Sequence, residues 1–242
     1  MIQVYTCILN HYDNLRPPAF REPVTKHVCY SDVMHSADGW EIQPAYQPYS
    51  CVRRNSRIPK ILAHLHADTE YSVWHDGCFR VAVSMQGLVN EWLRDADIAL
   101  FRHPRRPDIF TETDYCEQAG IGDIVAIREQ VARFRADGFP GPPFFAGGII
   151  FRLHTPEVAQ FNELWWSEYL KGPARDQFAL AYAVWKSGVR FRVIERCDIL
   201  QNPWLSFQHH AMFPHLSDNP QYEAQRQRSI DRIERLKTLC AS

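Results

Sequence analysis

Two carboxylates, Asp76 and Asp176, stand at positions where side chains of α/β proteins contact ligands. Residues 71–77 have the pattern of a β-strand that runs into a turn, with Asp76 at its carboxyl end. Open α/β sheets bind ligands at the carboxyl ends of their strands. Asp176 opens a predicted helix, and carboxylate oxygens are ligands that Mg2+ and Mn2+ prefer. The pair indicates a site for a metal ion or a sugar nucleotide, although an Asp-Gly turn and a helix-dipole partner would use the same residues without any ligand.

Two cations, Arg57 and Lys60, occupy a predicted helix after the third strand. Their three-residue spacing places them on one face of that helix. Cations in this position could neutralise a diphosphate group. Arg53 and Arg54 lie close by in the sequence, so a solvated basic face is the alternative interpretation.

Polar side chains also follow other predicted strands. Asp32 ends the second strand, where it could accept hydrogen bonds from a base or a ribose, or cap a turn. His103, Arg106 and Glu112 follow a later strand end and could line an acceptor or donor pocket. A surface loop would carry the same residues.

The histidines and cysteines narrow the chemistry further. His209 and His210 lie in a late loop, from which an imidazole could complete a metal site. The seven cysteines are scattered without CxxC spacing, which predicts reduced thiols and disfavours a zinc site. The chain has no GxSxG, P-loop or GxGxxG motif, so a serine hydrolase, a P-loop kinase and a Rossmann dehydrogenase have no support.

The elements that must position these residues alternate between strands and helices. The periodicity predicts strands over 2–9, 27–32, 40–45, 72–74, 96–102, 144–153 and 191–194, and helices over 56–66, 86–93, 123–136, 156–170, 176–186 and 221–239. Ser56 is the expected cap of the first helix, with Pro59 in its first turn. The alternation predicts an α/β fold with a mainly parallel central sheet flanked by helices. We expect a single domain over 1–242, ending in an amphipathic helical tail over 221–240.

Composition excludes several classes of protein. The chain of 242 residues is 45% hydrophobic and 23% charged, with a formal net charge of -1. A sizeable core can form, and no global charge favours nucleic acid or an anionic membrane as a partner. No apolar run is long enough to span a membrane, and no signal peptide is visible. A cytoplasmic protein is the expectation.

The ordered motifs resemble a family of glycosyltransferase-like domains, once of unknown function, that includes plant cell-wall and bacterial members. The resemblance spans roughly residues 2–210, and its most specific parts are Trp-x-Asp-Gly and Arg-Asp-Gln. It is carried by Tyr5-Thr6, residues 29–32, Arg57-x-x-Lys60, residues 71–77, His103-Pro104-x-Arg106 with Glu112, residues 148–152, Trp165-Trp166 and Arg175-Asp176-Gln177. The family is similar to glycogenin-type and lipooligosaccharide galactosyltransferase enzymes, which have the GT-A fold.

The resemblance implies transfer of a sugar from a nucleotide-diphosphate-sugar, with a UDP-sugar as the favoured donor. In the GT-A relatives an Asp-x-Asp element binds a metal ion and the diphosphate. Asp76 matches the first Asp, whereas Cys78 stands where the second would be, which puts the metal site in doubt. The relatives take another ligand from a late histidine, so Asp76, His209 and His210 are the expected ligands of Mn2+ or Mg2+.

The resemblance also implies roles for individual residues. Asp176 would hold hydroxyls of the donor sugar, and Gln177 would lie near the anomeric carbon. The base, ribose and diphosphate would contact Tyr5, Thr6, Asp32, Arg57, Lys60, Asp76 and Arg175. Retention of anomeric configuration is favoured, as in the glycogenin-like relatives. The spacing does not exclude a glycoside hydrolase built on two facing carboxylates.

Three hypotheses about the partner follow. The first is a transferase acting on a glycan, lipid-linked or small-molecule acceptor. The second is a transferase of the same fold that modifies nucleic acid, for which the arginines of residues 102–106 would serve. The third is a non-catalytic protein that binds a nucleotide-sugar or a glycan.

Overall fold

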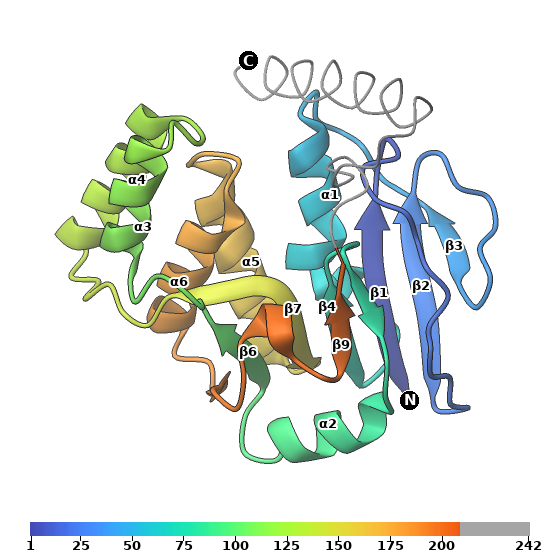
Figure 1. Cartoon of the computed structure of the whole chain (residues 1–242). Helices are drawn as coiled ribbons and strands as arrows, with labels where there is room; N and C mark the ends of the chain where they lie inside the picture. Colours follow the sequence, from blue (N-terminus) through green and yellow to red (C-terminus); the bar gives the residue numbers. More distant parts are fainter. Residues whose placement is uncertain (209–242) are drawn as a thin grey trace.

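A computed structural model describes residues 1–208, which form two sheets and the helices around them (Figure 1). The strands are β1 (Ile2–Ile8), β2 (Thr25–Ser31), β3 (Glu41–Pro44), β4 (Tyr71–His75), β5 (Phe79–Val81), β6 (Ile98–Arg102), β7 (Phe145–Leu153), β8 (Phe191–Ile194) and β9 (Leu205–Phe207). The α-helices are α1 (Val52–Ile61), α2 (Met85–Trp92), α3 (Ile109–Gln118), α4 (Ile124–Ala136), α5 (Pro156–Leu170) and α6 (Asp176–Ser187). Two short 3-10 helices are η1 (Ala63–Leu65) and η2 (Ile199–Gln201). The predicted tail over 221–240 lies outside the described residues.

The larger sheet has seven strands in the order β3-β2-β1-β4-β7-β6-β8. The β1–β2, β1–β4, β2–β3 and β6–β8 pairs are parallel, whereas β7 runs antiparallel to both β4 and β6. The expected α/β class with a mainly parallel sheet is confirmed. The parallel strands β1, β2 and β4 end at the same edge of the sheet, and the loops that follow them begin there.

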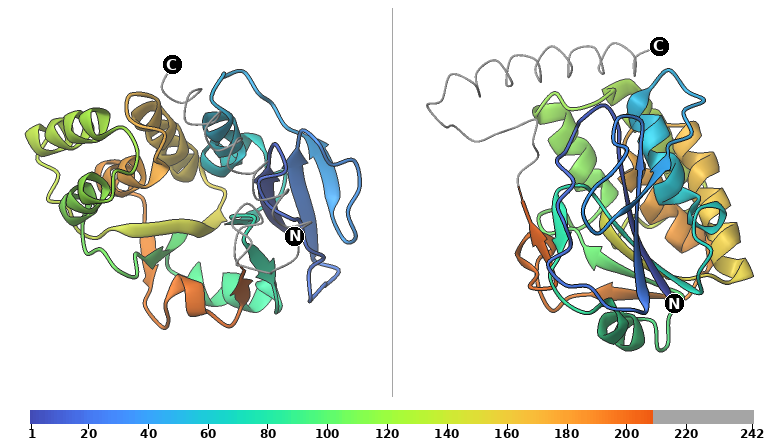
Figure 2. Two further views of the ribbon diagram at one scale, coloured as in Figure 1. Left: turned by 45° about the horizontal axis from the view of Figure 1, so that its top comes forward. Right: turned by 90° about the vertical axis from the view of Figure 1, so that its right-hand side faces the viewer.

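Alternation of side chains along the strands gives this sheet two apolar faces. Tyr5, Trp74 and Ile150 point to one face and pack against α5, α6 and the α3–α4 pair. Their neighbours Val4 and Val73 point to the other face and pack against α2 and the small β5–β9 sheet. Successive residues of a strand alternate between faces, so both sides are covered, as the two views of Figure 2 show. The sheet is the middle of three layers.

Several predicted elements differ from the structure. The first helix begins at Val52 rather than Ser56, and Pro59 lies inside it. Asn55 joins the start of the helix to the preceding loop, because its side chain exchanges two hydrogen bonds with the backbone of Tyr49. Ser56 donates its hydroxyl to the carbonyl of Arg53 instead of capping.

Helix α3, strands β5 and β9, and the 3-10 helix η2 were not predicted. Helix α3 has only a weak amphipathic pattern, because its buried positions include Glu112 and Thr113 as well as apolar residues. Strands β5 and β9 have three residues each and pair antiparallel with one another. Strands this short do not show a period of two, so pattern alone misses them.

The cysteines differ in their oxidation state. Cys7, Cys29, Cys78, Cys116 and Cys197 are free thiols. Cys51 is disulfide-bonded, so the expectation of reduced thiols fails at this position. Disulfides are rare in cytosolic proteins, and the bond gives no support to a cytoplasmic location.

Within residues 1–208, no helix combines the length and apolarity that a membrane crossing requires.

Two buried histidines predict a loss of stability in acid. Burial is the largest cause that lowers the pKa of His27 and of His154 from 6.5 to about 4. Because the unfolded histidines take up protons at higher pH than the folded ones, stability is complete above about pH 6.5 and falls as the pH drops toward 4. We expect urea titrations at stepped pH to show this decline.

The variant His154→Gln isolates one contribution to this slope. The ring of His154 contacts the hydroxyl of Ser72 at 2.8 Å, and a glutamine amide can keep a polar contact there without titrating. The variant should show a shallower decline than the wild type between pH 6.5 and 4. His35→Gln, at an exposed position, is the control that should leave the slope unchanged. An unchanged slope in His154→Gln would contradict the assignment.

Candidate active site

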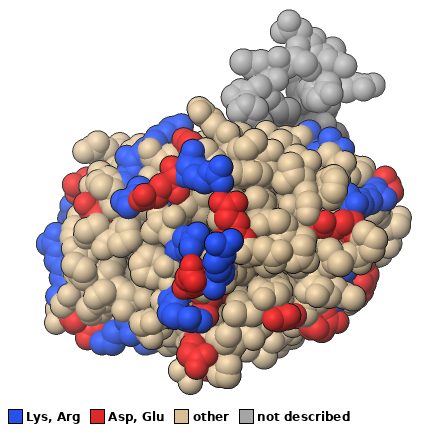
Figure 3. All heavy atoms as spheres, turned by 90° about the horizontal axis from the view of Figure 1, so that it is seen from below, with Lys and Arg blue, Asp and Glu red and all other residues tan. Residues whose placement is uncertain are grey.

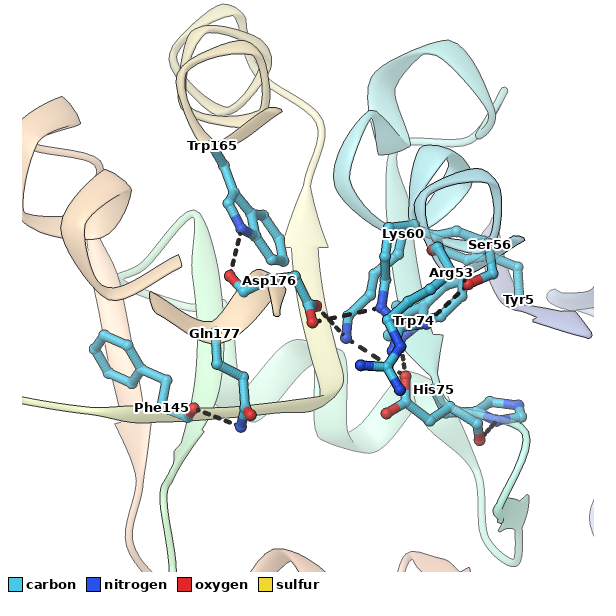
Figure 4. Close-up of polar contacts among 12 residues, drawn as sticks. Tyr5, Arg53, Ser56, Lys60, Trp74, His75, Phe145, Trp165, Asp176 and Gln177 are labelled. Atoms are coloured by element: carbon cyan, nitrogen blue, oxygen red, sulfur yellow. Dashed lines mark hydrogen bonds and ion pairs between the residues drawn. The ribbon is translucent and has the colours of Figure 1, made fainter. Parts of the chain in front are cut away.

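A lysine ammonium lies between the two carboxylates that the sequence singled out. Asp76 follows β4, and Asp176 is the first residue of α6. The Nζ of Lys60 is 2.6 Å from Oδ2 of Asp176 and 3.5 Å from Oδ1 of Asp76. Figure 4 shows Lys60 from α1 and Asp176 from α6 pointing toward one another. Lys60 is only 2% exposed, whereas the side chain of Asp76 is 29% exposed, so the cluster opens to solvent on the Asp76 side.

A second cation, Arg57, completes the cluster. Its Nε is 3.4 Å from Oδ1 of Asp176. Burial opposes the ionised form of Asp176, but Lys60 and Arg57 outweigh it and hold the pKa of this carboxyl well below its usual range. Burial likewise opposes the charge on Arg57, and Asp176 and Asp76 raise its pKa above the ordinary value. Asp176 and Arg57 are therefore both ionised at neutral pH.

Two tryptophans hold the carboxylate-bearing residues in place. The indole N–H of Trp74 donates to Oδ1 of Asp76 at 2.9 Å. The indole N–H of Trp165 donates to the backbone carbonyl of Asp176, also at 2.9 Å. Each donor is buried, and Trp N–H groups inside a protein usually find such a partner. These bonds fix the end of β4 and the start of α6 relative to the core.

Two glycines of β7 lie against the cluster. A Cβ at Gly147 would lie 3.4 Å from Nζ of Lys60, and one at Gly148 would lie 3.5 Å from Oδ2 of Asp76. The backbone carbonyl of Gly148 also accepts the N–H of Asp76 at 2.8 Å. The pairing register of β6 with β7 shifts beside these glycines, between Leu100 and Phe101. Such bulges re-aim residues next to functional sites.

Arg152 supports the cluster from inside the protein. Its side chain is fully buried, donates to the carbonyl of Lys60 at 2.9 Å, and donates to the hydroxyl of Tyr5 at 3.2 Å. The guanidinium also lies 5.8 Å from the centre of the Trp165 ring. Arg152 thus joins β1, β7, α1 and α5 directly below Lys60.

A second charged cluster adjoins the first through Arg175, the residue before Asp176. Glu112 is only 3% exposed and lies between two arginines, with Oε1 2.5 Å from Arg175 and Oε2 3.3 Å from Arg106. His103 accepts the backbone N–H of Arg106 through its Nδ1 at 3.0 Å. Burial is the largest cause that lowers the pKa of His103. The three residues expected to line a pocket are therefore together, and Arg175 joins them.

Glu112 should be important for stability. Replacing it with glutamine leaves Arg106 and Arg175 without the carboxylate between them, and breaking a buried ion pair costs about 3–5 kcal/mol. We expect Glu112→Gln to lower the midpoint of thermal unfolding. Glu117→Gln on the same helix is the matched control, because the Glu117–Arg128 pair is exposed and such pairs contribute little. Equal midpoints for both variants would contradict this role.

The other residues predicted for the donor and the anomeric carbon have different positions. Tyr5 and Thr6 are fully buried in β1, so their side chains do not reach the surface. Asp32 is exposed and accepts the backbone N–H of Asn10 at 2.8 Å, where Asn10 has a positive φ of 60°. Gln177 donates to the carbonyl of Phe145 at 3.4 Å, beside Asp176.

The described residues do not fit a metal site. Within residues 1–208, no three His, Cys, Asp or Glu side chains gather in a way that could hold a metal ion. Asp76 and Asp176 already contact Lys60, and Cys78 is buried where a second aspartate was expected. His209 and His210 lie outside the described residues.

Sequence reasoning missed three residues that build the site. Trp74 and Trp165 belonged to quoted motifs, but their roles as hydrogen-bond donors to Asp76 and Asp176 were not predicted. Arg152 was not singled out as a site residue. An arginine flanked by Phe151 and Leu153 in an apolar strand was the available signal, since a buried charge requires partners.

The comparisons with known proteins agree with these motifs. Residues 39–202 match the family model described as TOD1/MUCI70, glycosyltransferase-like domain, and the chain belongs to this family. The resemblance noted in the sequence is thereby confirmed, although Tyr5, Thr6 and Asp32 precede the matched region.

Two individual proteins are similar to the chain. The "Probable hexosyltransferase MUCI70" of Arabidopsis thaliana is 30% identical over 148 residues, which cover 55% of this chain and 25% of that protein. The chain thus spans about a quarter of the length of this curated relative. The solved structure of mouse xyloside xylosyltransferase 1, in its apo form, aligns with a TM-score of 0.45 and 11% identity over 80% of this chain and 84% of that chain.

Proposed function

We propose that this protein is a glycosyltransferase that moves a sugar from a nucleotide-diphosphate-sugar to a hydroxyl group of an acceptor. The observation that carries the proposal is the Asp76–Lys60–Asp176–Arg57 cluster at the carboxyl end of β4, in a chain that belongs to a glycosyltransferase-like family. Ligands of α/β sheets bind at this edge. A UDP-sugar is the donor that the family resemblance favours.

The charges of the cluster suit the two ends of such a donor. Arg57 is partly exposed, and its guanidinium can donate to diphosphate oxygens, as charge-assisted hydrogen bonds to phosphate require. Asp176 carries a permanent negative charge and would accept hydrogen bonds from hydroxyls of the donor sugar. Gln177, next in the chain, would lie near the anomeric carbon. These roles extend the family resemblance to the contacts seen here.

The reaction needs positioning more than strong acids or bases. The bond between the anomeric carbon and the diphosphate oxygen breaks, and the electron pair leaves with the nucleoside diphosphate. A new bond forms to the acceptor oxygen, whose proton goes to an oxygen of the released diphosphate. Cations that face the leaving group stabilise its developing charge, and fixed contacts to the sugar align the anomeric carbon with the acceptor.

The acceptor is the least defined partner. His103, Arg106 and Glu112 are joined to Arg175, the residue before Asp176, and we propose this cluster as the acceptor side of the site. A glycan, a lipid-linked sugar or a small molecule would present the required hydroxyl. Retention of configuration stays the preferred stereochemical outcome.

A nucleic acid acceptor has less support. The face of the molecule seen from below carries Lys and Arg beside Asp and Glu (Figure 3). Of the arginines in residues 102–106, Arg102 pairs with Glu195 at 2.8 Å and Arg106 pairs with Glu112 at 3.3 Å. Phosphate backbones are bound by clusters of free Lys and Arg, so these paired arginines do not favour the nucleic acid alternative.

A donor screen tests the proposal. The protein is incubated with a panel of nucleotide-sugars, with Mn2+ or with EDTA, and released nucleoside diphosphate is measured. We expect one donor to be turned over by the wild type and not by Asp76→Ala, with Asp198→Ala as a control at an aspartate that caps η2. Failure of every donor, together with no thermal shift from any nucleotide, would overturn the transferase proposal and leave a binding protein as the alternative.

A further inference from the structure

The space between the two carboxylates is already filled by a cation of the chain itself. The Lys60 ammonium contacts Asp176 at 2.6 Å and Asp76 at 3.5 Å, and Arg57 contacts Asp176 from the side at 3.4 Å. Two monocations thus face two carboxylates, and the formal charges of these four side chains cancel. A divalent cation placed between the carboxylates would lie against Lys60 and bring two further positive charges, which like-charge repulsion opposes.

The position of the ammonium is fixed by its surroundings. The carbonyl of Lys60 accepts a hydrogen bond from the buried Arg152 at 2.9 Å. The Nζ of Lys60 lies 5.8 Å from the centre of the Trp74 ring. The backbone contact and the ring therefore hold Lys60 at this place, with 2% of its side chain exposed.

We propose that Lys60 is the resident cation of the site and takes the place of a divalent metal between Asp76 and Asp176. This inference rests on the proposed function for its ligand, because it deepens the description of the same donor site. The diphosphate is then bound by Arg57 together with Asp76, Lys60 and Asp176. Its binding does not require a metal ion. Lys60 keeps the carboxylates oriented, and Arg57 provides the exposed positive charge.

The first experiment measures Mn2+ binding to the full chain without any nucleotide, by electron paramagnetic resonance titration. The wild type and Asp76→Asn should give the same titration, because Asp76 holds Lys60 and not a metal. Lys60→Met frees both carboxylates and should gain a Mn2+ site, which Lys60→Met/Asp76→Asn loses again. A wild-type Mn2+ site that disappears in Asp76→Asn would overturn the proposal. The comparison of wild type with Asp76→Asn decides the question even if the Lys60 variants do not fold.

The second experiment measures binding of UDP and of inorganic pyrophosphate by calorimetry, in EDTA and in MnCl2. We expect the dissociation constant to change by less than about threefold between the two conditions, a small difference in binding free energy. Binding that appears only with Mn2+ would overturn the proposal. If neither probe binds in either condition, the proposed function fails, and the Mn2+ titration still decides whether Lys60 fills the site.

Discussion

Replacing Lys60 with methionine should destabilise the protein by about 3–5 kcal/mol, because it leaves a buried carboxylate without its main counter-charge. Asp176 is 8% exposed, and Lys60 is its nearest cation at 2.6 Å. Methionine fills a similar volume, so the loss reflects charge rather than a cavity. Urea unfolding, followed by tryptophan fluorescence, measures the free energy of unfolding.

Two controls separate this effect from a general loss of packing. Lys186→Met removes an exposed lysine that pairs with Asp137 at the surface, and it should change stability little. The double variant Lys60→Met/Asp176→Asn should recover part of the loss, because it removes the unpaired charge together with its partner. If Lys60→Met is no less stable than Lys186→Met, the buried ion pair does not have the role assigned to it.

Replacing Asp176 with asparagine should abolish most of the turnover. The shape of the side chain is kept, but the fixed negative charge that would hold the sugar hydroxyls is lost. Removal of one preorganised electrostatic contact in an active site typically lowers kcat by about 10²–10³-fold. We expect this loss in nucleoside diphosphate release with the donor found in the screen.

The split between binding and turnover is the informative readout for Asp176→Asn. Arg57 and Lys60 remain, so binding of the nucleoside diphosphate should persist while transfer is lost. Asp137→Asn, which changes a surface carboxylate that contacts Tyr182 and Lys186 toward the other end of α6, is the matched control and should keep full turnover. Full turnover in Asp176→Asn would remove this residue from the proposed chemistry.

Local patterns in the sequence were sufficient for most element positions. Helices α2, α4, α5 and α6 begin within a residue of their predicted starts, and α4 and α5 begin directly after the capping residues Asp123 and Thr155. The direction of β7 was not predictable in this way. A buried strand of apolar residues looks the same whether it runs parallel or antiparallel, and only the pairing with β4 and β6 shows that it is antiparallel.

The residues of the site also divide into those that a local pattern predicts and those that only the fold brings together. Asp76 and Asp176 were found because each stands at the end of an element, which is a local property. Their common partner Lys60 was found only as a member of a basic pair, since 116 residues separate it from Asp176 and no local pattern relates them. Arg152 lies in a strand, and its contact with the carbonyl of Lys60 depends entirely on how β7 packs against α1.

The most direct test of the central claim is a crystal structure of the protein with the nucleoside diphosphate of its donor. The account predicts the diphosphate at the carboxyl end of β4, in contact with Arg57 and next to Asp76, with Lys60 still between the two carboxylates. A diphosphate bound elsewhere, or a metal ion in the place of the Lys60 ammonium, would contradict it.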